Sequence, residues 1–121
     1  MITIYHYPGC KKSREGLKYL QEKTQEIEIR NYLKNGISVP ELKDLLMKLN
    51  KSPHDMVRTQ EADYKTKFKG KNFTDDEWVK IMTENPRLIK RPIIIRNYKA
   101  VWGDPVSNID ILIWWRIRIS T

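Results

Sequence analysis

Hydrophobic and polar residues alternate over residues 2–6, and strict alternation returns over residues 26–30. A period of two is typical of a β-strand that buries one face. Between these segments, residues 11–23 carry Leu17 and Leu20 three positions apart, which favours a helix that packs by one side. A strand, a helix and a second strand in this order predict a parallel pair joined by a right-handed crossover.

The pattern becomes helical between residues 37 and 86. Ser38 with Glu41, and Thr74 with Glu77, have the spacing of capping boxes at helix N-termini. The apolar positions that follow recur at intervals of three and four, so each helix is expected to bury one stripe. These stripes are formed by Val39, Leu42, Leu45, Leu46 and Leu49, and by Trp78, Ile81 and Met82. We therefore expect a helical insertion between two halves of one sheet.

The C-terminal third predicts a hairpin and a closing helix. Residues 91–96 form a short apolar run led by Arg-Pro, residues 97–99 are turn-like, and residues 100–102 return as the partner strand. Residues 106–112 favour a last helix. The tail, residues 113–121, mixes basic residues with Trp114 and Trp115, and the pattern assigns it no structure.

Length and composition limit the class of protein. The 121 residues fit a single domain spanning 1–121, and no segment approaches the roughly 18 apolar residues of a membrane span. The N-terminus lacks a basic region followed by a long apolar run, so no export signal is expected. One cysteine permits no internal disulfide and fits a reducing compartment. We expect a cytoplasmic protein without membrane contact.

The formal net charge of +8 is compatible with nucleic acid, a membrane surface or a small anionic substrate. The densest basic run, residues 65–71, is interpreted as a solvated loop. No zinc-finger spacing, RNA-binding aromatic motif or long basic helix accompanies this run. Direct nucleic-acid binding is therefore not expected.

Cys10, the only cysteine, lies where the first strand gives way to the first helix. A thiol at a helix N-terminus faces unpaired backbone N–H groups and the positive end of the helix dipole, and both favour the thiolate. His6, Lys11, Lys12 and Arg14 add positive or potentially positive charge nearby. The alternative is a small, buried and inert side chain. Because Pro-Gly precedes Cys10 and Lys-Lys follows it, we expect an accessible nucleophile with a pKa below that of a free thiol.

The sequence shows no pattern that is typical of a metal or cofactor site. His6 and Cys10 are the only soft ligands close together, and His54 has no neighbouring partner. The chain has no nucleotide-binding glycine loop and no serine-hydrolase elbow. We expect no metal site and no bound cofactor.

The order of these elements resembles the thioredoxin-like α/β fold, with a mixed four-stranded sheet flanked by helices. More narrowly, the chain resembles the glutaredoxin-coupled arsenate reductase family and its Spx-type regulator relatives, from residue 2 to about residue 112. The resemblance is carried by residues 4–14, 56–58, 73–77 and 88–94. No single motif is decisive, but the ordered set and its spacing are specific.

This resemblance implies an enzyme that reduces arsenate to arsenite, with glutathione as co-substrate and glutaredoxin as partner. Cys10 would be the nucleophile that forms a thiol adduct with the oxyanion. His6 would help to lower the pKa of Cys10, although a structural hydrogen bond is an equal alternative at a strand end. Ser13 would donate or accept a hydrogen bond near the sulfur.

The resemblance also implies an oxyanion site. Arg58 and Arg91 match two arginines that line it, and forked guanidinium groups suit a tetrahedral oxyanion. Arg14 would add positive charge to the same site. Pro92 matches the proline that is cis in thioredoxin-like folds and brings backbone close to the reactive cysteine.

Asp104 departs from the family pattern, because it stands where these reductases carry a third arginine. A carboxylate directed into the site would repel an oxyanion and raise the pKa of the thiol. A carboxylate directed to solvent, or capping the final helix, would only remove a donor. The sequence leaves both orientations open.

Two alternatives keep the same fold. In the first, Cys10 acts on glutathione mixed disulfides as a monothiol reductase, with an external thiol resolving the adduct. In the second, the chain is a non-catalytic Spx-like regulator that binds RNA polymerase. Ser13 occupies the position of the second cysteine of a Cys-x-x-Cys switch, so such a regulator would lack an internal redox switch.

Overall fold

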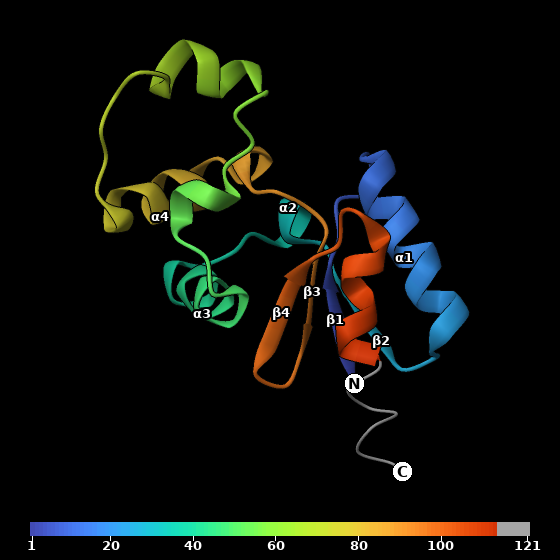
Figure 1. Ribbon diagram of the computed structural model, residues 1–121. Helices are drawn as coiled ribbons and strands as arrows, with labels where there is room; N and C mark the ends of the chain where they lie inside the picture. Colours follow the sequence, from blue (N-terminus) through green and yellow to red (C-terminus); the bar gives the residue numbers. More distant parts are fainter. Residues whose placement is uncertain (114–121) are drawn as a thin grey trace.

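The computed structural model describes residues 1–113 and is built on one four-stranded mixed sheet (Figure 1). Its order is β2-β1-β3-β4, where β1 is Ile2–Tyr5, β2 is Ile27–Arg30, β3 is Ile93–Arg96 and β4 is Lys99–Trp102. β1 pairs with β2 in parallel and with β3 antiparallel, and β3 and β4 form a hairpin. The predicted parallel pair, hairpin and mixed four-stranded sheet are confirmed.

Helices cover both faces of this sheet. The α-helices are α1 (Lys11–Lys23), α2 (Tyr32–Asn35), α3 (Val39–Leu49) and α4 (Asp75–Glu84). The 3-10 helices are η1 (Pro53–Met56), η3 (Pro86–Leu88) and η4 (Val106–Ile109), and η2 (Tyr64–Phe68) is a π-helical turn. α1 and η4 share one apolar cluster with the sheet, and the insertion forms a second cluster on its other side.

The insertion is helical as predicted, and three details in it or just before it differ from the prediction. Val39 is exposed, because it lies in the first turn of α3 ahead of the buried stripe. α2 was not predicted, since four residues are too few to show a period. The expected loop at residues 65–71 overlaps the π-helical turn, although its lysines are exposed. Trp114 and Trp115 lie outside the described residues.

Trp78 anchors the outer part of the insertion. The ring of Phe73 packs edge-on at 5.0 Å between centroids, and the ring of Tyr64 stacks at 6.4 Å. Phe68 contacts both Phe73 and Trp78. Aromatic pairs at these separations favour such tilted or offset geometries. This cluster fixes the segment that runs from Tyr64 to α4.

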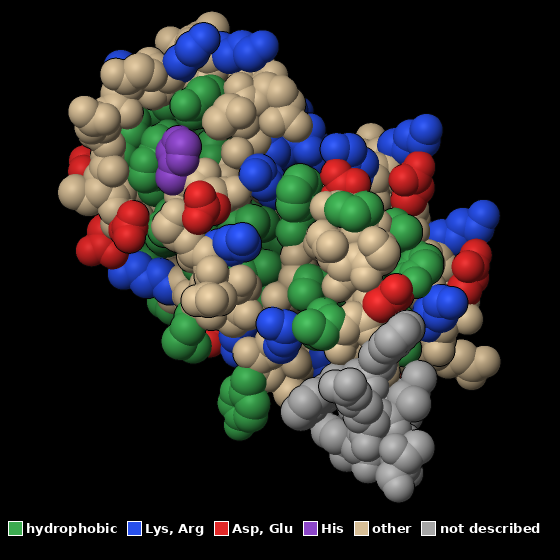
Figure 2. Space-filling model, viewed as in Figure 1, with side chains coloured by type: hydrophobic (Ala, Val, Ile, Leu, Met, Phe, Trp, Pro, Cys, Tyr) green, Lys and Arg blue, Asp and Glu red, His purple; other side chains and the backbone are tan. Residues whose placement is uncertain are grey.

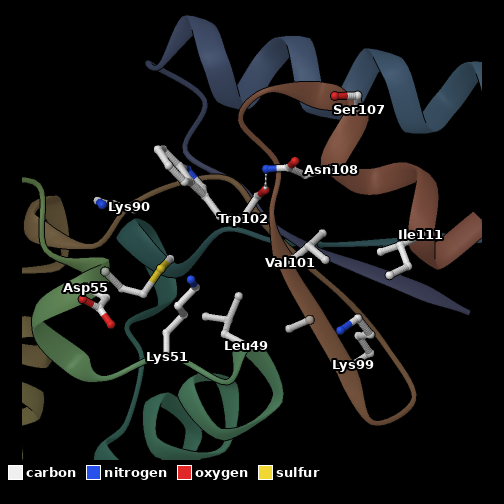
Figure 3. Close-up of a pocket in the computed structure, with 12 residues that line it drawn as sticks. Leu49, Lys51, Asp55, Lys90, Lys99, Val101, Trp102, Ser107, Asn108 and Ile111 are labelled. Carbon is white, nitrogen blue, oxygen red and sulfur yellow. Dashed lines mark hydrogen bonds between the residues drawn. The ribbon is translucent and has the colours of Figure 1, made fainter.

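Basic side chains on the visible surface are interspersed with acidic and hydrophobic ones (Figure 2). An open groove of about 750 Å³ lies between the insertion and β4, and Lys51, Lys90 and Lys99 line it together with Asp55 and Trp102 (Figure 3). The Lys90 ammonium lies 4.9 Å from the centroid of the Trp102 ring. Cys10, Arg58 and Arg91 are not among the residues that line this groove.

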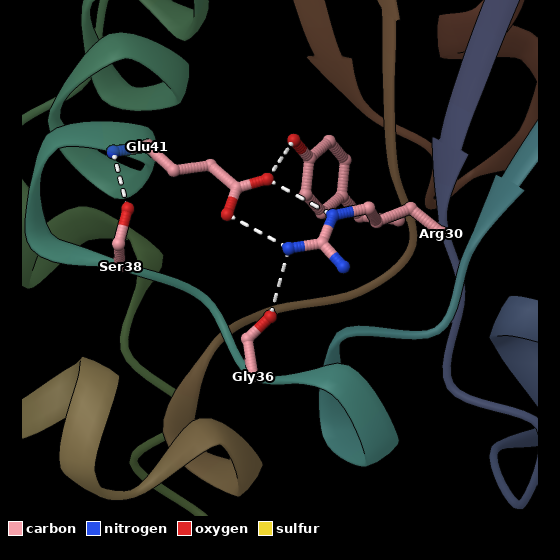
Figure 4. A network of polar contacts seen from close by, with 5 residues as sticks. Arg30, Gly36, Ser38 and Glu41 are labelled. Atoms are coloured by element: carbon pink, nitrogen blue, oxygen red, sulfur yellow. Dashed lines mark hydrogen bonds and ion pairs between the residues drawn. The ribbon is translucent and has the colours of Figure 1, made fainter.

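A carboxylate network ties the start of α3 to the sheet (Figure 4). Glu41 accepts hydrogen bonds from the Tyr5 hydroxyl at 2.7 Å and from two nitrogens of Arg30 at 3.0 and 2.9 Å. The Ser38 hydroxyl accepts the Glu41 N–H, as predicted, but the Glu41 carboxylate does not return to Ser38. The predicted capping box is therefore half formed, because the carboxylate has a stronger partner in the Arg30 guanidinium.

Replacing Glu41 should destabilise the fold in a pH-dependent way. The hydrogen bonds from Arg30 lower the pKa of Glu41, partial burial opposes them, and the Tyr5 hydroxyl lowers it further. Since the folded pKa lies below the unfolded value, this stabilisation is present above about pH 4.3 and is lost as pH falls further. We expect Glu41→Gln to cost about 1–3 kcal/mol at neutral pH.

Urea unfolding between pH 3 and 7 checks this expectation, with the exposed Glu28→Gln as the matched control. The difference between wild type and Glu41→Gln should narrow below about pH 4.3. A difference that stays constant with pH would contradict the ion-pair account.

Candidate active site

Cys10 is the N-cap residue of α1, at the end of the turn that follows β1. Its backbone N–H donates to the Tyr7 carbonyl at 3.0 Å, and its side chain caps no helix N–H. Partial burial raises the pKa of the Cys10 thiol. The backbone N–H of Ser13, the Arg91 guanidinium and the backbone N–H of Lys12 outweigh burial, so the pKa lies below its usual value. These donors stabilise a thiolate at the start of α1.

His6 and Ser13 form a buried pair beneath this turn. The Ser13 hydroxyl lies 2.8 Å from Nδ1 of His6 and accepts the Tyr7 N–H at 2.8 Å. Burial and the charge of Arg14 lower the pKa of His6, which keeps its ring neutral at neutral pH. The structural hydrogen bond that the sequence left open for His6 is therefore present. The backbone N–H of Ser13 helps to lower the pKa of Cys10, while the Ser13 hydroxyl accepts the Tyr7 N–H and holds the turn.

Arg91 is the buried cation of the site. Its guanidinium carbon lies 3.9 Å from the centroid of the Tyr7 ring, and its Nη1 donates to the Arg87 carbonyl at 2.8 Å. A guanidinium over an aromatic face gains a cation–π interaction, which is stronger when desolvated. Arg91 is only 6 % exposed, so its charge acts on Cys10 with little screening by water.

The Arg91–Pro92 peptide is cis, as the family resemblance implies. Pro92 packs tightly against two glycines: a Cβ on Gly16 of α1 would lie 2.8 Å from Cγ of Pro92, and one on Gly103 would lie 3.0 Å from it. The first contact is closer than real Cβ atoms come to a neighbouring atom, and the second would be unusually tight. The absence of a Cβ at these positions brings the Arg91–Pro92 turn against α1 and hence toward Cys10.

Arg58 follows η1 and lies in the same region. Its backbone N–H donates to the Leu88 carbonyl at 2.7 Å, next to the bridge between Val57 and Ile89. Its Nε donates to Oε1 of Glu61 at 3.0 Å, and the same oxygen lies 3.8 Å from Nη2 of Arg91. The structure thus brings the two predicted arginines together around one carboxylate.

Arg14 is placed differently from the other two arginines. Its Nη1 donates to the Pro8 carbonyl at 2.9 Å, and the side chain is exposed. It acts on His6 by charge, but it is not among the groups that lower the pKa of Cys10. The guanidinium is held on the outer side of the turn, away from the contacts that join Arg58 and Arg91.

Asp104 points toward the first turn of α1 and does not cap η4, whose N-cap residue is Pro105. Its Oδ2 lies 2.7 Å from Nζ of Lys12, and both side chains are partly exposed. The carboxylate is therefore paired with a cation two residues beyond Cys10. A pair of this exposure contributes about 0–1 kcal/mol to stability. Its effect on the site is to neutralise Lys12.

Three residues of the site were not predicted from sequence. Tyr7 belongs to the motif around Cys10, but only the structure shows its ring beneath Arg91. Glu61 follows Arg58 by three positions, a spacing that indicates an ion pair only when the segment is helical. Tyr32 is 1 % exposed, and its hydroxyl has no hydrogen-bond partner within the described residues 1–113. The charges of Arg91, Cys10 and Arg58 act on this hydroxyl.

The site has the chemistry of an anion site. The Arg91 guanidinium and the backbone N–H groups of Ser13 and Lys12 favour the Cys10 thiolate, and Arg58 lies near Arg91 around Glu61. Among residues 1–113, no group of three or more His, Cys, Asp and Glu side chains is arranged to hold a metal ion. Over the same range, no helix is long and apolar enough to cross a membrane.

Replacing Arg91 should make Cys10 less acidic and less reactive. In Arg91→Met, the loss of the guanidinium beside the sulfur should raise the pKa of Cys10 and slow its alkylation by iodoacetamide several-fold at neutral pH. Arg14→Met removes the same charge from the outer side of the turn and should leave the pKa of Cys10 close to that of wild type. Equal pKa increases in both variants, measured by thiolate absorbance, would contradict this geometry.

Comparisons with known proteins agree with this fold. The model of the ArsC family matches residues 5–112. The arsenate reductase of Neisseria meningitidis serogroup A is 34% identical over 114 residues, covering 93% of this chain and 97% of the relative. That of Haemophilus influenzae is 36% identical over 110 residues, covering 89% and 95%.

The structure is also similar to a solved structure over most of the chain. The solved structure of the arsenate reductase from Vibrio cholerae superposes with a TM-score of 0.85 at 36% sequence identity, covering 91% of this chain and 96% of that one. The expected thioredoxin-like α/β fold is thereby confirmed. The matched range includes Cys10, Arg58 and Arg91. The chain belongs to the ArsC family.

Proposed function

We propose that this protein is an arsenate reductase that uses the Cys10 thiolate as its nucleophile. The observation that carries the proposal is the position of Cys10 at the start of α1, where the buried Arg91 guanidinium and the backbone N–H groups of Ser13 and Lys12 lower the pKa of its thiol. These groups stabilise the thiolate and attract an oxyanion to it. Membership of the ArsC family and the arsenate reductases among its relatives support arsenate as the substrate.

In the first step, the thiolate attacks arsenic and forms an S–As bond. One arsenate oxygen takes up two protons and leaves as water, while arsenic stays in the +5 state. We propose that Arg58 and Arg91, which lie together around Glu61, bind the remaining oxygens, and that the N–H groups at the start of α1 stabilise the sulfur. Positioned donors of this kind stabilise charge as it moves from sulfur to oxygen.

Reduction then needs two electrons from outside the chain, because Cys10 is its only cysteine. We propose that glutathione attacks the adduct and that glutaredoxin completes the release of arsenite. Overall, arsenate and two thiols give arsenite, one disulfide and water. Glutathione is thus a co-substrate rather than a bound cofactor. Thiol chemistry of this kind fits the cytoplasm, where thiols are kept reduced.

Asp104 bears on the efficiency of this reaction. Its carboxylate is paired with Lys12, so it does not face the Cys10 site as an unpaired charge. The site consequently works with two arginines, and Lys12 is neutralised. We propose that this arrangement supports arsenate reduction without the third arginine.

The proposal predicts arsenate-dependent NADPH oxidation in an assay coupled through glutathione, glutaredoxin and glutathione reductase. Wild type should turn over, and Cys10→Ser should fall to background. Arg58→Lys should raise the KM for arsenate about tenfold, because a lysine cannot bind two oxygens with a fork of donors. Arg87→Lys, an equivalent change at an exposed arginine, should leave KM unchanged.

Turnover that survives in Cys10→Ser would exclude the thiol mechanism. Absence of turnover in wild type, combined with Cys10-dependent reduction of a glutathione mixed disulfide, would favour the monothiol reductase. Binding to RNA polymerase, the regulatory alternative, remains a prediction that a pull-down with wild type and Cys10→Ser would test.

A further inference from the structure

Glu61 occupies the position between the two arginines where a substrate oxyanion is expected. We propose that its carboxylate is the resident anion of this site, and that a tetrahedral dianion must displace it in order to bind. Glu61 would then set the affinity of the site for oxyanions. This inference rests on the proposed function, since it concerns the same substrate site.

The contacts of Glu61 define this position. One carboxylate oxygen, Oε1, lies 3.0 Å from Nε of Arg58 and 3.8 Å from Nη2 of Arg91. The side chains of Arg58 and Arg91 are 15% and 7% exposed, whereas that of Glu61 is 26% exposed. The carboxylate therefore enters from the solvent side and faces two largely buried cations.

The Glu61 carboxylate does not satisfy all the hydrogen-bond donors near it. Its 3.8 Å separation from Arg91 is too long for a hydrogen bond. Among residues 1–113, the buried side-chain atoms without a hydrogen-bond partner are Nε of Arg91 and the hydroxyl oxygen of Tyr32. Leaving such donors unpaired is unfavourable. A tetrahedral oxyanion presents four oxygens and can satisfy donors that a single carboxylate oxygen leaves free.

The position of Glu61 in the chain allows its side chain to rotate away from the two arginines. It ends a turn in which its N–H donates to the Arg58 carbonyl at 3.2 Å, and Ala62 and Asp63 beyond it are exposed. The aromatic cluster around Trp78 begins only at Tyr64. Rotation of the Glu61 side chain toward solvent thus requires no change in the sheet or in that cluster.

The charges of the site indicate which anions can displace the Glu61 carboxylate. When Cys10 is the thiolate, its charge and that of the Glu61 carboxylate balance the two guanidinium groups. A monoanion that displaces Glu61 only replaces one negative charge by another. A dianion gains a further attraction to the same two cations. We therefore expect sulfate, phosphate and arsenate to compete with Glu61 better than nitrate does.

Protection of Cys10 from iodoacetamide by added anions tests this inference, with each variant normalised to its own rate without anion. Sulfate is the probe, because it is tetrahedral and does not react with thiols. Glu61→Gln removes the competing charge with little change in shape, and Glu61→Ala removes it independently. Asp63→Asn is the matched control, since it makes the same charge change at an exposed site in the same segment.

We expect the half-protecting sulfate concentration to fall about tenfold in both Glu61 variants and to change less than about twofold in Asp63→Asn. Unchanged or weaker protection in the Glu61 variants, with wild type protected, would overturn the role of Glu61 and leave the proposed function standing. Protection of wild type by nitrate equal to that by sulfate would overturn the preference for dianions. Failure of sulfate, phosphate and arsenate to protect any variant would overturn both this inference and the oxyanion site.

Discussion

The packing of Pro92 against α1 is the constraint on which the site depends. There is no room for a Cβ on Gly16 beside the proline ring, and a Cβ on Gly103 would also lie unusually close to this ring. Arg91 directly precedes Pro92 in the C-terminal part of the chain. The contact between Pro92 and α1 therefore holds Arg91 near the N-terminus of the first helix. The reactive thiol and its cation are therefore positioned by the apolar core rather than by each other.

Burying the Arg91 guanidinium is costly, and the structure offsets the cost through several partners. The Tyr7 ring lies against its face, the Arg87 carbonyl accepts one N–H, and Cys10 and Glu61 supply negative charge. In the part of the chain that the structure describes, Nε of Arg91 has no hydrogen-bond partner. A cation held in this way is well suited to a ligand that arrives with negative charge, because the cost of desolvating the guanidinium has already been met by folding.

Much of this arrangement could be predicted from sequence, since it follows from local patterns. The alternation of hydrophobic and polar residues predicted β1 and β2, and the turn residues around Cys10 predicted the start of α1. The position of Arg91 near Cys10 came only from the family resemblance. Glu61 and the half-formed capping box at Glu41 could not be predicted, because a carboxylate in a loop or first helical turn shows no sign of its distant partner. The pairing of Asp104 with Lys12 likewise depends on how the turn before η4 approaches α1.

The most direct test of the account is a crystal structure of the protein soaked with arsenate, with the arsenic located by its anomalous signal. The account predicts arsenic bonded to Sγ of Cys10, with its oxygens bound by Arg58 and Arg91 and the Glu61 carboxylate turned toward solvent. Arsenic bound instead in the groove lined by Lys51 and Lys90, with Cys10 unmodified, would contradict it.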